Sequence, residues 1–366
     1  MKKLQLDSLR PGLSFTEAVY IEDENVLVPA GIAVRKKDLE RLKAWGVESV
    51  ETGGEAVRPP GTPELSDPYW NYTGLIEQMN TVFERISAGG KSDPAELDQI
   101  VDRLLQLVRA EQTSIIGYVL GSVVKGNPLA KNAVNTAILT ALICGEFKIT
   151  GRPFIQAVTA ALLHDAGMLW LSPNIVSKQG SLSESEMQLM RTHPIYSYTI
   201  ACREFAFPDE MGRIVLQHHE RWDGEGYPNR FRGKRIDPWA RIISVADAFE
   251  AMVSEKSYRN SMIGYQAMKN LLADNAMRFD PDVLKAFIKT MGIYPIGSLV
   301  LLNNRVIARV VKVQRDAPLR PRVRILIDQT GAAYNPHEGP LIDLVQEKSL
   351  FIARPMEFRE IPVKGE

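Results

Sequence analysis

The spacing of apolar residues divides the chain into regions, and the first of these has a mixed pattern. Up to about residue 52, short apolar runs alternate with turn residues, and one helix is predicted over residues 36–45. We therefore expect a small N-terminal α/β module over residues 1–55. Residues 56–68 are rich in proline and glycine, which is typical of a linker.

The middle of the chain, residues 69–292, has apolar residues at three- and four-residue spacing, which predicts an all-α bundle. The longest predicted helices cover residues 76–86, 95–108, 129–147, 154–163, 209–219 and 238–254. Ser183 and Glu186 have the spacing of a capping box, so a helix should begin there and run toward His193. Pro194 disfavours helical geometry at His193 and can itself begin a new helix.

After residue 292 the pattern becomes alternating, which predicts a C-terminal β-rich, barrel-like domain over residues 293–366. Residues 298–302 and 305–314 read as a hairpin around Asn303-Asn304, because asparagine tolerates the positive φ of a tight turn. The expected fold class is multidomain and mainly α, with the helical bundle in the centre.

Charge and cysteine usage exclude several classes of function. Lys plus Arg and Asp plus Glu are equal at 44 each, so no global field favours a nucleic acid polymer or a membrane surface. Arg320, Arg322 and Arg324 should line one solvated face of a strand, but they lack the aromatic partners of a nucleic-acid surface. Cys144 and Cys202 lie inside apolar helical patterns, as core thiols do in a reducing compartment. We expect a cytoplasmic protein with no targeting segment.

Four of the five histidines form one candidate ligand set with two aspartates, and His337 is not part of it. The set consists of His164, Asp165, His193, His218, His219 and Asp247. Asp247 lies in a helix that is apolar nearly all round, where an ionised carboxylate costs several kcal/mol unless it is paired or bound to metal. Any one of these residues read alone is better explained as a satisfied structural residue. Taken together, mixed nitrogen and oxygen donors favour a cation site.

These residues resemble the motifs of the HD-GYP family of metal-dependent phosphohydrolases over residues 118–290. The matching sequence motifs are His164-Asp165-x-Gly167, His193-Pro194, His218-His219-Glu220, Gly226-Tyr227-Pro228, Arg241 to Asp247, and Tyr258-Arg259. The resemblance implies hydrolysis of cyclic di-GMP by a metal-activated hydroxide, at a centre of two divalent metals, iron or manganese.

The resemblance also implies a role for each matching residue. Asp165 would bridge the metals, and His164 and Asp247 would hold one of them with Asn132; Asp165 and His164 are the expected catalytic pair. The other metal would be held by His193, His218 and His219. The expected substrate-binding residues are Lys256, Arg259, Gly226, Tyr227 and Pro228. For Tyr227 alone, packing against the helix end is an equal alternative.

Four positions depart from the family pattern. Asn132 stands where the family has a histidine, and an amide oxygen is a weaker ligand for a transition metal. Pro128 replaces a glutamate that binds a third metal in some members, Met168 replaces a lysine and Glu250 an aspartate. Met168 and Asn132 favour weak or absent catalysis.

Three interpretations therefore stay open for the chain as a whole. It is a two-metal phosphodiesterase, a catalytically impaired receptor for cyclic di-GMP, or a scaffold that binds neither nucleotide nor metal. The terminal domains carry no motif that names a ligand, and docking or dimerising is the more ordinary role for such domains, so protein partners and a homodimer are further hypotheses.

Overall fold

The computed structural model divides into two compact units, Met1–Asp67 and Pro68–Glu366. It describes residues 2–360 except 7–8, 10–13, 22–24, 29–33, 35–38, 40–41, 43–46, 48, 55, 58–67, 122–126, 179, 255–263, 274, 336–337 and 357–359. Each unit is described by itself below.

The first unit contains a small antiparallel sheet. Its strands follow the order β1 (Lys2–Gln5), β5 (Ser49–Thr52), β3 (Val19–Ile21) and β4 (Asn25–Val28), and β2 (Ser14–Phe15) pairs with β6 (Ala56–Val57). The predicted helix over residues 36–45 lies outside the described residues, apart from Leu39 and Leu42, which are both buried.

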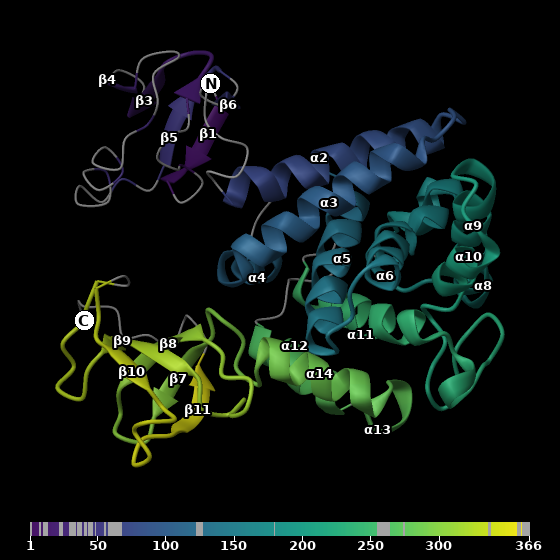
Figure 1. The fold of residues 1–366 in the computed structure, drawn as a ribbon. Helices are drawn as coiled ribbons and strands as arrows, with labels where there is room; N and C mark the ends of the chain where they lie inside the picture. The colour runs from purple at the N-terminus through teal and green to yellow at the C-terminus, as the bar shows by residue number, and fades with distance from the viewer. Residues whose placement is uncertain are drawn as a thin grey trace. The chain divides into compact units, whose positions relative to one another are not determined.

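The second unit begins with the helical bundle that the apolar spacing predicts (Figure 1). Its first helices are α2 (Pro68–Ser87), α3 (Pro94–Ala110), α4 (Gln112–Gly121), α5 (Pro128–Glu146), α6 (Arg152–Leu163), η2 (Ala166–Trp170), α7 (Pro173–Val176) and α8 (Glu184–Met190). Then follow α9 (His193–Thr199), η3 (Ile200–Glu204), α10 (Asp209–Leu216), η4 (Gly233–Arg235), α11 (Pro238–Val253), α12 (Gly264–Ala273), α13 (Asn275–Arg278) and α14 (Pro281–Met291).

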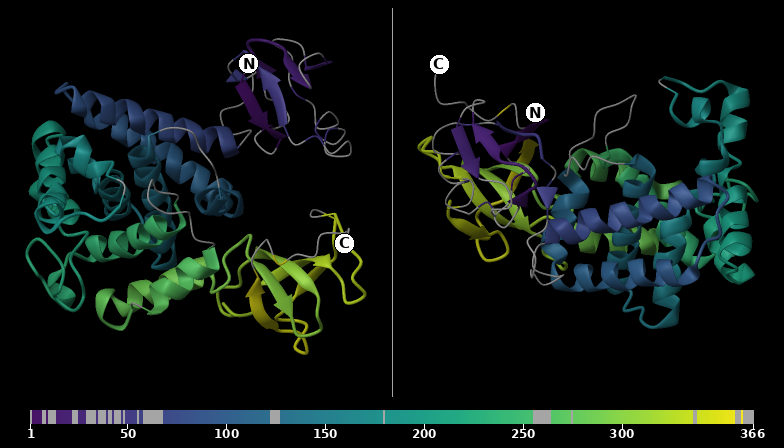
Figure 2. Two further views of the ribbon diagram at one scale, coloured as in Figure 1. Left: turned by 180° about the vertical axis from the view of Figure 1, so that it is seen from behind. Right: turned by 90° about the horizontal axis from the view of Figure 1, so that it is seen from above.

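Helix α5 is the centre of this bundle. It contacts α2, α3, α6, α11 and α14, and its residues from Ala133 to Cys144 are all buried. A helix that is apolar nearly all round has to be covered on every side, which explains this position. Figures 1 and 2 show α2 and α3 side by side along one edge of the bundle, and α11 and α14 on the other side of α5. None of the described helices is long and apolar enough to cross a membrane.

The helix boundaries follow their capping residues. Ser183 and Glu186 form the predicted capping box, and α8 ends at Met190, three residues before His193 begins α9. Helix α10 is shorter than predicted, because it ends at Leu216 and the chain then turns through His218 and His219. The turn is closed by a bond from the Glu220 amide to the Gln217 carbonyl, 2.9 Å long.

The C-terminal part is one antiparallel sheet in the order β10-β9-β8-β7-β11. These strands are β7 (Leu299–Leu302), β8 (Ile307–Lys312), β9 (Arg322–Ile327), β10 (Leu341–Asp343) and β11 (Ile352–Met356). Among the described residues β10 and β11 are edge strands, so the sheet is open and the expected barrel-like closure is wrong.

One local prediction in this sheet is also corrected. The β7–β8 hairpin forms, but Arg305 adopts the positive φ, at 67°, rather than an asparagine. The Asn304 side chain instead accepts a bond from the Val306 amide at 3.3 Å.

The arginines of the predicted row alternate with the buried Pro321 and Val323, as expected, since Arg322 is exposed and Arg320 and Arg324 are half-buried. Each is also bonded within its own domain. Arg320 donates to the Leu344 carbonyl at 2.7 Å, and Arg322 pairs with Asp343 at 3.0 Å. Arg324 donates to the Gly339 carbonyl at 3.1 Å. These arginines are therefore used to hold the strands and loops of the sheet together.

Candidate metal centre

Three of the predicted ligands are histidines at or just after the C-terminal ends of helices. In His164, His193 and His218 the ring Nδ1 lies 2.6–2.7 Å from the backbone carbonyl three residues earlier. These carbonyls belong to Ala161, Met190 and Val215. A carbonyl can only accept, so Nδ1 carries the proton and Nε2 presents its lone pair. Each helix end therefore fixes both the ring and the nitrogen that a metal would use.

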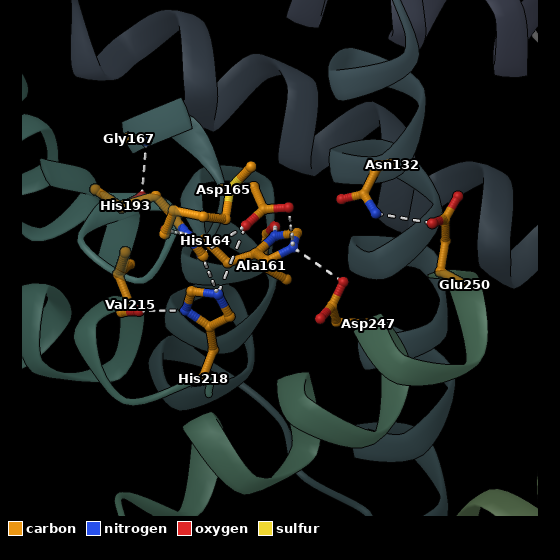
Figure 3. Close-up of polar contacts among 12 residues, drawn as sticks. Asn132, Ala161, His164, Asp165, Gly167, His193, Val215, His218, Asp247 and Glu250 are labelled. Atoms are coloured by element: carbon orange, nitrogen blue, oxygen red, sulfur yellow. Dashed lines mark hydrogen bonds and ion pairs between the residues drawn. The ribbon is translucent and has the colours of Figure 1, made fainter. Parts of the chain in front are cut away.

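These nitrogens meet at one carboxylate, that of Asp165 (Figure 3). Its Oδ1 lies 3.1 Å from Nε2 of His193 and 3.6 Å from Nε2 of His218. Its Oδ2 lies 3.4 Å from Nε2 of His164, which in turn is 3.5 Å from Oδ1 of Asp247. The two oxygens of this one carboxylate therefore lie close to two different groups of possible metal ligands.

The donors form two groups with metal-ligand spacing, each group within 4.8 Å. The first contains Asp165, His193, His218 and His219, and the second contains His164, Asp165 and Asp247. Because Asp165 belongs to both, the arrangement can hold two cations with a shared carboxylate, which is the two-metal arrangement of many phosphoester hydrolases.

Two atoms at this junction are buried without a hydrogen-bond partner in the described part of the chain. They are Nε2 of His164 and Oδ1 of Asp165. Leaving such atoms unsatisfied costs about 1–3 kcal/mol each, more for a charged group. Bound cations would remove that cost, so the residues present fit a divalent metal that accepts both nitrogen and oxygen ligands.

The electrostatics divide the site in the same way. Burial lowers the pKa of His164, but Asp165 and Asp247 outweigh it and raise that pKa well above its usual value. Burial lowers the pKa of His218, and burial together with the neighbouring His218 and His193 lowers the pKa of His219 well below its usual value. Burial thus favours the neutral, metal-binding form of His218 and His219, while the two carboxylates favour a positive charge, a proton or a metal ion, at Nε2 of His164.

The loop with Gly226, Tyr227 and Pro228 is folded back against the ligands. The Tyr227 amide donates to the His219 carbonyl at 3.2 Å, and its ring stacks on the His219 ring with centroids 4.8 Å apart. A Cβ at Gly226 would lie 2.3 Å from the Arg221 nitrogen, so only glycine allows this close approach. Burial and the two site carboxylates raise the pKa of Tyr227, so its hydroxyl stays protonated. The loop therefore forms one wall of the site.

A second glycine brings the two ligand segments together. At Gly167 an added Cβ would lie 2.1 Å from the His193 carbonyl, and the Gly167 amide donates to Oγ of Ser197 at 2.7 Å. The turn after Asp165 can therefore pack directly on the start of α9.

Asn132 lies at the other side of the site, on α5. Its Nδ2 donates to Oε2 of Glu250 at 2.7 Å, whereas its Oδ1 is buried and has no hydrogen-bond partner among the described residues. In Figure 3 the nitrogen faces Glu250, and the oxygen faces the side on which Asp165 and Asp247 lie. This free oxygen is the donor that the ligand prediction for Asn132 requires.

Lys256 and Arg259, predicted to bind phosphate, lie outside the described residues. Sequence reasoning missed another cation, Arg191, whose guanidinium carbon lies 5.6 Å from the centre of the Tyr227 ring. Arg191 is exposed and forms no ion pair with any described residue. Its place two residues before His193 was visible in the sequence, but its stacking on Tyr227 was not.

Fold and ligand set together define an HD-domain protein. A family model described as an HD domain matches residues 123–283, and a second, described as a KOW domain associated with HD domain, matches residues 299–364. With the motifs around its histidines, the chain belongs to the HD-GYP family.

Named relatives agree with this assignment. The chain is 24% identical over 95% of its length to the cyclic di-GMP phosphodiesterase PdeB of Borreliella burgdorferi, of which it spans 91%. It is 28% identical over 67% of its length to a cyclic di-GMP phosphodiesterase of Pseudomonas aeruginosa, of which it spans 59%. Among solved structures, an HDG"Y"P protein from Bdellovibrio bacteriovorus aligns with a TM-score of 0.53 at 17% identity, covering 78% of this chain and 97% of that one. That likeness shows a shared fold.

Proposed function

We propose that this protein is a phosphodiesterase that hydrolyses cyclic di-GMP at a two-metal centre. The observation that supports this most directly is the position of Asp165, whose two oxygens face two separate groups of ligands. The names of the relatives supply the substrate class, since both the Borreliella and the Pseudomonas proteins are named cyclic di-GMP phosphodiesterases.

The residues of the chain divide the work of such a reaction. His193, His218 and His219 would hold one cation through imidazole nitrogens, with Asp165 as the shared ligand. His164, Asp247 and Asn132 would hold the other. Two cations, iron or manganese, would supply an activated water nucleophile and stabilise charge on the phosphodiester.

Binding of the nucleotide needs positive charge near the metals. Among the described residues Arg191 is placed for this, because its guanidinium stacks on Tyr227 and is free of carboxylates. A guanidinium matches the geometry of a phosphate and can bind two of its oxygens at once. We assign Arg191 to the phosphate and Tyr227 to the wall of the pocket, while Lys256 and Arg259 remain predicted phosphate ligands.

A receptor for cyclic di-GMP is the second candidate, and Asn132 favours it. An amide oxygen binds a transition metal more weakly than an imidazole does, so the metal beside His164 and Asp247 is the one at risk. A chain that lacked this metal would retain the Tyr227 wall and Arg191, and could bind the nucleotide without cleaving it.

Metal content and turnover measured on one sample separate the two candidates. The protein is purified anaerobically, its metals are counted by mass spectrometry, and cyclic di-GMP cleavage is followed with added Mn²⁺ or Fe²⁺. We expect two metals per chain and turnover that falls by at least about a thousandfold in Asp165→Ala, since both metals lose a ligand. Nucleotide binding without product, at two bound metals, would refute the phosphodiesterase and leave the receptor.

A further inference from the structure

We propose that Glu250 is a positioning residue, which fixes the amide of Asn132 so that its oxygen faces the metal beside His164 and Asp247. This inference rests on the metal site of the proposed function. It concerns a different question, namely how a neutral amide is made to act as a ligand.

The orientation of the amide follows from the chemistry of its partner. A carboxylate oxygen can only accept a hydrogen bond, so the Asn132 atom 2.7 Å from Oε2 of Glu250 has to be the nitrogen. The amide oxygen is then on the other side, where it is buried and accepts no hydrogen bond from any residue that the structure describes. An asparagine free to rotate by 180° would present its NH₂ to the cation for part of the time, and an NH₂ group cannot bind it.

Glu250 is itself held from two further directions. Its Oε1 accepts from Nδ2 of Asn135 at 3.1 Å and from the hydroxyl of Ser254. Asn135 is fixed in turn, because its Oδ1 accepts from the hydroxyl of Tyr72 at 2.8 Å. Glu250 is 1% exposed, and Asn135 and Tyr72 are fully buried.

This network joins three helices, since Tyr72 lies on α2, Asn132 and Asn135 on α5, and Glu250 on α11. Three donors, two from α5 and one from the residue after α11, hold the Glu250 carboxylate. Packing alone does not require a buried carboxylate here, and a buried carboxylate is costly unless its acceptors are satisfied. Within the described part of the chain the network leaves the Asn132 oxygen without a hydrogen bond, and we infer that orienting this atom is its purpose.

Replacing Glu250 by glutamine tests the direction of these bonds. In Glu250→Gln the side chain keeps its shape, and its oxygen can still accept from Asn135 and Ser254. Its NH₂ then faces Asn132, which has to turn its own oxygen toward Gln and its NH₂ toward the metal. We expect Mn²⁺ affinity at this site to fall by about 10- to 100-fold, while the histidine-held Mn²⁺ stays bound.

A paired substitution should restore the site. In Asn132→Asp with Glu250→Gln, the glutamine NH₂ donates to one aspartate oxygen, and the other oxygen faces the metal whichever way the group turns. We expect this double variant to recover two Mn²⁺ per chain with an affinity within about threefold of the parent or tighter, since it also adds a charged ligand. A purely structural role for Glu250 predicts no such recovery.

The measurement uses the full chain and Mn²⁺ alone. Bound metal is counted at buffered free Mn²⁺, and electron paramagnetic resonance distinguishes an exchange-coupled pair from an isolated ion. Asp280→Asn is the matched control, because Asp280 is another buried carboxylate, paired with Arg241 away from the ligands. We expect it to keep the coupled pair.

Two results would overturn the inference. One is a folded Glu250→Gln variant that binds both Mn²⁺ ions as tightly as the parent. The other is a double variant that folds but still lacks the second Mn²⁺, which decides the matter even where the single variant does not fold. Neither result depends on cyclic di-GMP turnover, so a parent that binds two Mn²⁺ and cleaves nothing would refute the proposed function and leave this inference standing.

Discussion

The two halves of the candidate metal centre are built in different ways. In the half with His193 and His218, each ring is fixed by a carbonyl of the helix turn that precedes it. In the other half only His164 is fixed in this way, by the Ala161 carbonyl. Asp247 projects from the interior of α11 and Asn132 from the first turns of α5, and Asn132 depends on Glu250, 118 residues away in the sequence.

This difference separates local from distant support. A histidine at a helix end needs only its own turn, so its geometry is decided by about four residues of sequence. A ligand in the interior of a helix needs partners from other helices, so its geometry depends on how α2, α5 and α11 pack. We therefore expect the histidine half to bind metal more tightly and to tolerate distant substitutions better.

The largest expected effect comes from removing one ligand from each half in turn. His218→Ala and Asp247→Ala should each leave one Mn²⁺ per chain and lower turnover by about 10²- to 10³-fold, as the loss of one electrostatic contact in a catalytic site commonly does. The comparison also predicts which of the two variants binds its remaining Mn²⁺ more tightly. The Mn²⁺ that remains in Asp247→Ala should bind at least about tenfold more tightly than the one that remains in His218→Ala, because it keeps three imidazoles.

Metal titration of the two variants under identical buffering gives this order directly. A melting temperature close to that of the parent in metal-free buffer serves as the control for folding, because bound Mn²⁺ itself stabilises the folded state. Equal affinities, or the reverse order, would break the comparison, because they would mean that helix-end support gives no advantage.

Sequence alone was enough for much of the bundle and for the composition of the site. The apolar spacing predicted α2, α3, α5, α6 and α11, and the Ser183–Glu186 capping box formed as expected. The cluster of His164, Asp165, His193, His218, His219 and Asp247 was also predicted, because each stands in a recognisable motif. Their roles as ligands remain predictions.

The parts that sequence could not give depend on precise boundaries and on distant contacts. The end of α10 at Leu216 rather than at His219 is decided by a turn that Gln217 and Glu220 close. The hydrogen bond between Asn132 and Glu250 joins two helices far apart in the sequence, and no local sequence pattern predicts it. Likewise, nothing in the amino-acid sequence around Arg191 indicates that its guanidinium stacks on the Tyr227 ring.

A smaller effect is expected at Arg191, which belongs to neither half. Arg191→Ala should raise KM for cyclic di-GMP by about 10-fold, because one charge-assisted contact to phosphate is lost, and should leave metal content unchanged. Arg191→Lys should recover only part of the loss, since an ammonium lacks the planar fork of a guanidinium.

Steady-state kinetics with metal analysis of each preparation tests this expectation. Arg213→Ala is a suitable control, because Arg213 is an exposed arginine of α10 that pairs with Asp209. A variant at Arg191 with normal KM would show that the phosphate is bound elsewhere, and a variant that lost metal would place Arg191 in the support of the histidine half.

The smallest effect tests whether helix ends really do support the histidines. Ser183→Ala removes the N-cap of α8, the seven-residue helix whose Met190 carbonyl holds His193. It should cost about 1 kcal/mol of helix stability. Because His193 is held at the far end of α8, we expect faster amide hydrogen exchange across residues 184–190 but a change in Mn²⁺ affinity of no more than about twofold.

Asp93→Ala is the control, because it removes the equivalent cap of α3 and should speed exchange only in that helix. A large loss of Mn²⁺ in Ser183→Ala would mean that the whole of α8, rather than its last turn, positions the ring, and the histidine half would then be less self-contained than its geometry indicates.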